Sequence, residues 1–241
     1  MGLELKHLRL IPPSWLAWPE NARLDGAIRR RDVRGKLGRG NMLIDFWSRT
    51  SGPVHPDDEA VFERFEGQHT FELAYPPPAF IGNPDAPVVV LLANGGRSRR
   101  GEFDDPGAAG AFYAALRGEK FTLEDVHGSE PLRGWVAAGL AVRVNSVAYR
   151  SERLSAEPAN RAVAEHLPSV ALHRRWLRED VLPAARAGKR FVIAHRRGVW
   201  GLERSEASET VIFTANPISP QPSKAATDKA REWLAKRGHP V

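Results

Sequence analysis

The sequence predicts an α/β fold: a three-layer sandwich around a central, mainly parallel four-stranded sheet. Three observations predict it. Four short apolar runs lie at 87–93, 140–149, 190–195 and 210–215, each run ends in polar or glycine-rich residues, and helical stretches separate the runs. Continuous apolar runs are typical of strands buried on both faces of a sheet. Their alternation with helices indicates parallel pairing.

Three helices are expected, at 107–118, 169–188 and 223–238. In the second helix, Ser169 is suited to cap the amino end and Gly188 to cap the carboxyl end. Pro183 lacks a main-chain N–H, so it should end or kink the first part of this helix.

The composition indicates one globular core. The chain has 241 residues, 42% of them hydrophobic, with seven Trp and a net charge of +6. The excess of basic residues favours a polyanionic partner, although an ordinary basic protein would look the same. There is no Cys, and the eight His show no metal-binding spacing, so we expect neither a metal nor a cofactor.

Residues 1–84 differ from the rest of the chain. They carry three of the tryptophans, a proline run at 75–80 and an arginine cluster at 28–41. We interpret them as an N-terminal extension packed on an α/β domain at 85–241. The arginines fit a solvated face or phosphate contact equally well. The N-terminus lacks the apolar core of a signal peptide, and no apolar run is long enough to span a membrane, so a cytoplasmic protein is expected.

Polar residues follow the four predicted strands. Asn94, His195 and Asn216 stand at or just beyond the end of a run, and Asn145 begins the polar part of the run at 140–149. Ligands of such sheets bind outside the carboxyl ends of the strands. The turn at 94–101 matches neither the P-loop nor the Rossmann spacing. An Asn inside an apolar strand, as at 145, is either a structural hydrogen-bonding hub or a reader of a polar ligand edge.

Taken in chain order, the four runs and the residues that flank them also resemble the sequence motifs of a known protein family. "VVVLLANGG" at 88–96, "GWVAAGLAVRVNSVAYR" at 134–150, "RFVIAH" at 190–195 and "VIFTANPISPQPSKA" at 211–225 resemble the successive motifs of the uracil-DNA glycosylase superfamily. The similarity covers residues 85–237 and is closer to the Asn-containing, mismatch-specific branch. It implies that family's fold and the hydrolysis of a base–sugar bond in DNA.

The resemblance assigns roles to the residues that follow the strands. Asn94 takes the place of the water-activating Asp or Asn, Asn145 that of the Asn that binds the flipped base, and Asn216 that of the residue stabilising the leaving base. Phe103 would stack on the base or pack in the core. The DNA contacts would come from Arg97, His195, Arg196, Ile218, Ser219, Ser223 and Lys224.

Two departures from the family pattern bear on specificity. Gly95 and Gly96 stand where uracil-specific members have Pro and a bulky Tyr that excludes 5-substituted bases. The pocket should therefore accept a pyrimidine substituted at C5. Ile218 replaces the expected Ser of the DNA-contacting loop.

Two side chains limit the chemistry. Asn94 cannot act as a general base, but it can hold a water by hydrogen bonding. A carboxylate from Glu102, Asp104 or Asp105 could assist, although a solvated acidic loop explains these three as well. A freely rotating Asn145 carboxamide would accept either uracil or cytosine.

The sequence thus predicts a monomeric, monofunctional DNA glycosylase, with no metal, that acts on a flipped, C5-substituted or modified pyrimidine in double- or single-stranded DNA. A hypermodified cytosine of phage DNA, removed in defence, is one such substrate. The alternatives are a uracil or thymine mismatch glycosylase and, from another class, a nucleic-acid or nucleotide binder without catalysis.

Overall fold

The computed structural model describes residues 41–97, 106–119, 130–152, 154–214 and 222–240. These residues belong to one compact unit that begins at Arg39. The expected boundary between residues 84 and 85 lies inside this unit. Within the described ranges, no helix is long and apolar enough to cross a membrane.

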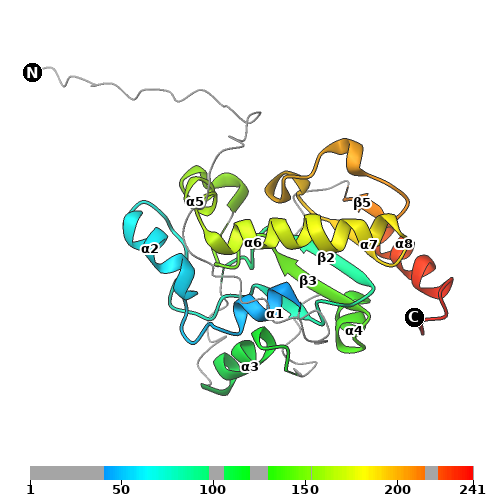
Figure 1. The fold of residues 1–241 in the computed structure, drawn as a ribbon, viewed down its shortest axis with the longest axis horizontal. Helices are drawn as coiled ribbons and strands as arrows, with labels where there is room; N and C mark the ends of the chain where they lie inside the picture. The colour runs from blue at the N-terminus through cyan, green and yellow to red at the C-terminus, as the bar shows by residue number, and fades with distance from the viewer. Residues whose placement is uncertain (1–40, 98–105, 120–129, 153, 215–221, 241) are drawn as a thin grey trace, which may run out of the picture. The chain divides into compact units, whose positions relative to one another are not determined.

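The centre of the unit is a five-stranded mixed sheet in the order β1-β3-β2-β4-β5 (Figure 1). Its strands are β1 (Phe80–Gly82), β2 (Val88–Leu92), β3 (Ala141–Asn145), β4 (Phe191–Ala194) and β5 (Val211–Phe213). Strands β2 to β5 pair in parallel, whereas β1 is antiparallel to β3 at the edge. The α/β class and the mainly parallel sheet are confirmed, but the predicted number of four strands was wrong.

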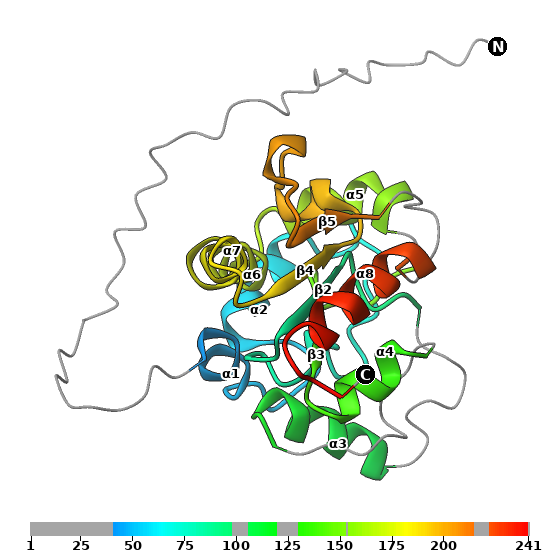
Figure 2. The same ribbon diagram turned by 90° about the vertical axis from the view of Figure 1, so that its right-hand side faces the viewer.

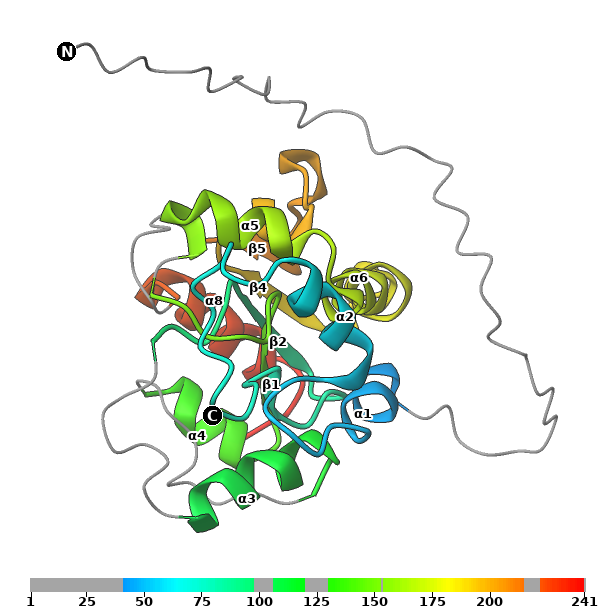
Figure 3. The same ribbon diagram turned by 90° about the vertical axis from the view of Figure 1, so that its left-hand side faces the viewer.

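The additional strand, β1, was not predicted because it is short and lacks a sequence pattern typical of strands. It contains only three residues, and it follows three prolines at 76–78 that cannot donate to a sheet. Helices α1 (Met42–Trp47) and α2 (Pro56–Arg64) precede it and pack against α6 (Pro168–Trp176) (Figure 3). The region expected to be an extension therefore supplies two helices and an edge strand to the unit.

The remaining helices cover both faces of the sheet. Helices α6 and α7 (Leu182–Arg186) lie on one side of the strands, and α4 (Leu132–Ala137) and α8 (Lys224–Ala235) lie on the other (Figure 2). Outside these layers are α3 (Pro106–Leu116) and α5 (Pro158–Ala164), with short turns at Leu154–Ala156, Arg197–Trp200 and Arg204–Glu206. The layers agree with the predicted sandwich.

The predicted helix at 169–188 is continuous but irregular. A five-residue π segment, Leu177–Val181, joins α6 to α7 just before Pro183. Proline lacks the N–H for a regular helical bond, so the wider π turn accommodates it. Gly188 follows the helix with φ of +69°, as expected of a C-terminal glycine. The predicted N-cap at Ser169 was wrong, because Pro168 starts the helix and Leu167 precedes it.

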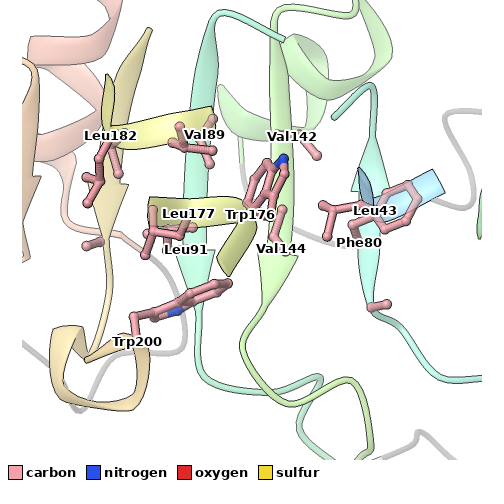
Figure 4. Close-up of a cluster of buried hydrophobic side chains, with 14 of the residues drawn as sticks. Leu43, Phe80, Val89, Leu91, Val142, Val144, Trp176, Leu177, Leu182 and Trp200 are labelled. Atoms are coloured by element: carbon pink, nitrogen blue, oxygen red, sulfur yellow. The ribbon is translucent and has the colours of Figure 1, made fainter. Parts of the chain in front are cut away.

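The sheet has a separate core on each face. On the α6 side, Trp176 packs over the alternating Val89, Leu91, Val142 and Val144 of β2 and β3 (Figure 4). On the other side, Val88, Val90 and Ile193 pack against Trp135 of α4 and Trp233 of α8. This alternation decides which side chains of each strand face which helices.

Candidate functional site at the carboxyl ends of the strands

Three of the predicted site residues lie at or just beyond the carboxyl ends of neighbouring parallel strands. Leu92 of β2 pairs with Asn145 of β3, and the His195 amide beyond β4 donates to the Leu91 carbonyl. Asn94 lies two residues beyond Leu92. The sheet register therefore brings Asn94, Asn145 and His195 to one end of the sheet, as predicted from the ends of the apolar runs.

The Asn145 side chain is held by the proline run. Its Nδ2 donates to the main-chain carbonyl oxygen of Pro78 at 2.5 Å, and Asn145 is only 8% exposed. The Oδ1 is buried and has no hydrogen-bond partner among the residues described. A half-turn of the carboxamide would place Oδ1 against the Pro78 oxygen, which is unfavourable. The free rotation expected from the sequence is thus prevented, and the site presents a buried acceptor.

The main chain of Asn145 is fixed from the opposite face of the sheet. His173 of α6 lies between the indole Nε1 of Trp47, 2.7 Å from its Nε2, and the Asn145 carbonyl oxygen, 2.7 Å from its Nδ1. Because the indole can only donate, Nε2 accepts and Nδ1 carries the proton. Burial lowers the pKa of His173 to about 4, so the ring is neutral at pH 7.

A second indole fixes the end of β2. The Nε1 of Trp200 donates to the Leu92 carbonyl oxygen at 2.8 Å, and its ring stacks on His173. Two tryptophans and one histidine thus anchor the ends of the two strands that lead to Asn94 and Asn145.

Asn94 is half-buried and oriented by Ser151. Its Nδ2 donates to the main-chain oxygen of Ser151 at 3.1 Å and to the hydroxyl oxygen at 3.0 Å. This leaves Oδ1 as the acceptor that Asn94 can offer to a water or ligand. Ser151 is fully buried and follows Arg150, whose main chain pairs with Glu72.

The two glycines after Asn94 have different surroundings. A Cβ at Gly95 would lie 2.5 Å from Cγ of Pro78, so this position admits no side chain without movement of the proline run. A Cβ at Gly96 would meet no other described residue within 4 Å, although φ there is +70°. The described residues thus leave space beside Gly96, the position at which the resemblance puts the steric block of uracil-specific enzymes.

His195 is buried and its Nδ1 lies 2.8 Å from the hydroxyl oxygen of Thr214, just beyond β5. The next residue, Arg196, is half-buried and has φ of +56°, the only positive φ of a non-glycine residue described. Such backbone strain is found more often at functional sites than elsewhere.

The described residues assigned to DNA contact have protein partners in this structure. The exposed Arg97 lies 3.6 Å from a carboxylate oxygen of Glu72 and 3.4 Å from one of Glu152. Lys224 donates to Asp228 at 2.6 Å, and Ser223 caps α8 by accepting from the Ala226 amide. Exposed ion pairs are weak, so both cations could exchange these partners for phosphates.

Several assigned residues lie outside the described ranges. These are Phe103, Asn216, Ile218 and Ser219, together with the candidate carboxylates at 102, 104 and 105. The described part of the chain contains no cluster of three His, Asp or Glu side chains that could hold a metal.

Sequence reasoning missed the partners that orient the site. Pro78, Ser151 and His173 are 67, 57 and 28 residues from the asparagines that they contact. Only the proline run itself was a visible signal. Tyr149 ends the apolar run at 140–149. In the structure it is a core residue whose hydroxyl donates a hydrogen bond to the buried Asp58.

Comparison with known proteins gives no match of any kind. No family model, no curated protein and no solved structure matches the chain.

Proposed function

We propose that the chain is a DNA glycosylase that binds a flipped pyrimidine at the carboxyl ends of β2, β3 and β4 and hydrolyses its bond to the sugar. The observation that carries the proposal is the buried Oδ1 of Asn145, which has no hydrogen-bond partner among the described residues. Asn145 ends β3, and the neighbouring strand β2 leads to Asn94. A buried acceptor without a donor costs about 1–3 kcal/mol, which a bound ligand would recover.

The orientation of Asn145 restricts the ligand. Because Nδ2 is committed to Pro78, the free Oδ1 calls for an N–H donor on the ligand. The N3–H of uracil or thymine and the exocyclic amine of cytosine both qualify. A base reaches this depth only when it is flipped out of the stack and held by its Watson–Crick edge.

Asn94 would position the attacking water. Its Nδ2 is taken by Ser151, so its Oδ1 accepts a hydrogen from the water and orients the oxygen toward the sugar carbon. An amide cannot remove the proton, so the rate should be lower than with a carboxylate. Bond cleavage leaves the electron pair on the departing base, and Asn216 is the assigned donor to that base.

The open space beside Gly96 supports a substituted base. A group on C5 of the pyrimidine would enter the region that a tyrosine closes in uracil-specific enzymes. Among the described residues beyond its two neighbours in the chain, none has an atom within 4 Å of a Cβ built at Gly96. Modified pyrimidines, including those of phage DNA, are therefore the substrates we favour over plain uracil.

The proposal is tested with duplex and single-stranded oligonucleotides containing uracil, a thymine mismatch, hydroxymethylcytosine or glucosylated hydroxymethylcytosine. Alkali then converts each abasic site into a strand break. We expect breaks with a modified base, and their loss in Asn94→Ala and Asn216→Ala. Asn83→Ala is the matched control, because Asn83 is exposed beyond β1 and lies at the opposite end of the sheet.

A binder without catalysis is the second candidate, because Asn94 provides no general base. DNA binding by the wild type, with no breaks on any substrate, would favour the binder and refute the glycosylase.

A further inference from the structure

A cavity of about 820 Å³ lies at the amino ends of β4 and β5. Its wall includes Phe191, the first residue of β4, Thr210, just before β5, and the carboxyl-terminal parts of α7 and α8. Phe191 pairs with Val88 at the start of β2, whereas Asn94 follows the end of that strand. The cavity and the candidate site are therefore at opposite ends of the sheet. Small-molecule sites commonly measure about 300–1,000 Å³, so the cavity has the size of a ligand site.

The residues that line the cavity carry more positive than negative charge. Two of them are glutamates, at 209 and 232, and four are basic: Arg186, Lys229, Lys236 and Arg237. Arg186 lies 3.8 Å from a carboxylate oxygen of Glu206, so part of its charge is already balanced. The other three cations give the cavity its preference for an anion.

The two lysines differ from the other cations of α8. Lys229 and Lys236 are exposed, and no carboxylate in the described ranges forms an ion pair with either of them. Lys224 and Arg231, which do not line the cavity, both pair with Asp228 on the same helix. Water can solvate exposed lysines, so the argument for a ligand also needs a group that is held in position for it.

The guanidinium of Arg237 is such a group. Its Cζ lies 3.9 Å from the centre of the Trp233 ring, and its Nη2 donates to the Gly188 carbonyl oxygen at 2.9 Å. Its Nη1 donates to the Trp233 carbonyl oxygen at 3.4 Å. These bonds use two of the five N–H donors, so others remain for a ligand. A guanidinium that is already fixed loses little freedom when it binds a phosphate.

The remaining lining residues indicate which kind of anion fits. Glu209 and Glu232 are exposed at the cavity and would repel an extended polyanion such as a DNA backbone. A carboxylate can, however, accept hydrogen bonds from ribose hydroxyls. The half-buried Ile212 adds apolar surface against which a base can lie. Cations, carboxylates and apolar surface together match the three parts of a nucleotide.

We propose that this cavity binds a ribonucleotide with at least two phosphates. The phosphates meet Arg237, Lys229 and Lys236, and the ribose hydroxyls meet a carboxylate of the cavity wall. Arginine and lysine are the side chains that most often bind phosphate groups. The inference goes beyond the proposed glycosylase, because it concerns a second ligand at the other end of the sheet.

The first test is calorimetric titration of the full chain with metal-free ATP, GTP, CTP and UTP, each in turn. We expect at least one of them to bind with a stoichiometry of one. The affinity should fall about tenfold or more in Lys229→Gln/Lys236→Gln, because two contacts with charged phosphates are lost. Absence of binding by all four nucleotides would overturn the proposal.

The matched control is Lys224→Gln/Arg231→Gln. It removes the same amount of charge from the same helix, but from residues that do not line the cavity. We expect the nucleotide to bind this variant as tightly as the wild type. Equal weakening in the two double variants would indicate general attraction to a basic protein, and would contradict a site at the cavity.

The second test examines the nucleoside. The best of the four nucleotides should bind about tenfold more tightly than its 2′,3′-dideoxy form, since the carboxylates then lose the hydroxyls that they accept from. Glu209→Gln/Glu232→Gln should reduce this preference. Tripolyphosphate that binds as tightly as the nucleotide would show a site for phosphates alone, and would refute a nucleotide site.

A competition experiment separates the nucleotide from DNA. A duplex that displaces the nucleotide from the wild type, and that binds Lys229→Gln/Lys236→Gln more weakly, would assign the cavity to DNA and overturn the proposal. Nucleotide binding is measured without DNA, so its failure would leave the proposed glycosylase unaffected.

Discussion

The Nδ1 of His173 lies 2.7 Å from the main-chain carbonyl oxygen of Asn145, the last residue of β3. The other ring nitrogen accepts from Trp47 of α1, so one neutral imidazole links two helices to the strand end that carries the proposed base-reading residue. Segment 41–50 therefore contributes to the position of Asn145, although it lies about a hundred residues earlier in the chain.

Replacement of His173 by Phe should destabilise the fold. The change preserves an aromatic ring but leaves the Asn145 carbonyl and the Trp47 indole N–H buried without partners. At about 1–3 kcal/mol for each such group, the free energy of unfolding should fall by about 3 kcal/mol. Urea unfolding at pH 7.5 measures it. His239→Phe near the C-terminus is the control, and equal stability of the two variants would contradict the role of His173.

The stability of the wild type should fall as the pH drops from 6.5 toward 4. The pKa of His173 is lowered by burial from 6.5 to about 4, so the unfolded chain binds a proton in this range that the folded chain does not. The full effect is about 3 kcal/mol. Burial lowers the pKa of His55 and acts in the same direction.

Asp58 opposes this trend. Burial raises its pKa, so the folded chain retains a proton that the unfolded chain releases, and its contribution to stability grows as the pH falls toward 3.8. Urea unfolding between pH 4 and 7.5 should nevertheless show the decrease, and a smaller one in His173→Phe. A variant with the same slope as the wild type would exclude His173 as its source.

Removal of the Tyr149 hydroxyl should cost about 2 kcal/mol. The hydroxyl donates to Oδ2 of the fully buried Asp58 at 2.6 Å and accepts from the His55 amide at 3.1 Å. In Tyr149→Phe both groups lose this partner inside the core. Thermal unfolding of this variant, with Tyr75→Phe at the exposed tyrosine as control, measures the loss. No difference in Tm would mean that water replaces the hydroxyl.

The two glycines after Asn94 should respond differently to substitution. Gly95→Ala places a methyl group 2.5 Å from Pro78, and relieving this overlap should cost about 1–3 kcal/mol. It should also displace the Pro78 carbonyl that accepts from Asn145. In Gly96→Asn the new Cβ meets none of the described residues outside its chain neighbours, and asparagine tolerates the left-handed φ of +70°, so the change should cost less than about 1 kcal/mol. Calorimetric Tm values rank the two, and the reverse order would be incompatible with this geometry.

The elements that the sequence predicted well are those with a strong local signal. The five consecutive apolar residues of β2 and the capped α8 need no distant information. The three-residue β1 could not be found in this way, because an edge strand of that length has no period. The cap at Ser169 failed for a tertiary reason: its amide donates to the buried Asp58, 111 residues away.

In the candidate site, too, the local features could be predicted and the distant contacts could not. That Asn94, Asn145 and His195 lie at one end of the sheet was predictable, because the polar residues at the carboxyl ends of parallel strands meet at the same edge of the sheet. The contacts that orient the two asparagines could not be predicted, because the Pro78 carbonyl and the Ser151 hydroxyl come from other parts of the chain. The acceptor that Asn145 presents depends on that contact with Pro78.

The proposed glycosylase activity can be measured by mass spectrometry of the small molecules released when the protein is incubated with duplex DNA containing a modified pyrimidine. We expect the free base in solution and an intact strand with one abasic site, with both products absent for Asn145→Ala. DNA that is bound but releases no base, from any of the substituted pyrimidines, would contradict it.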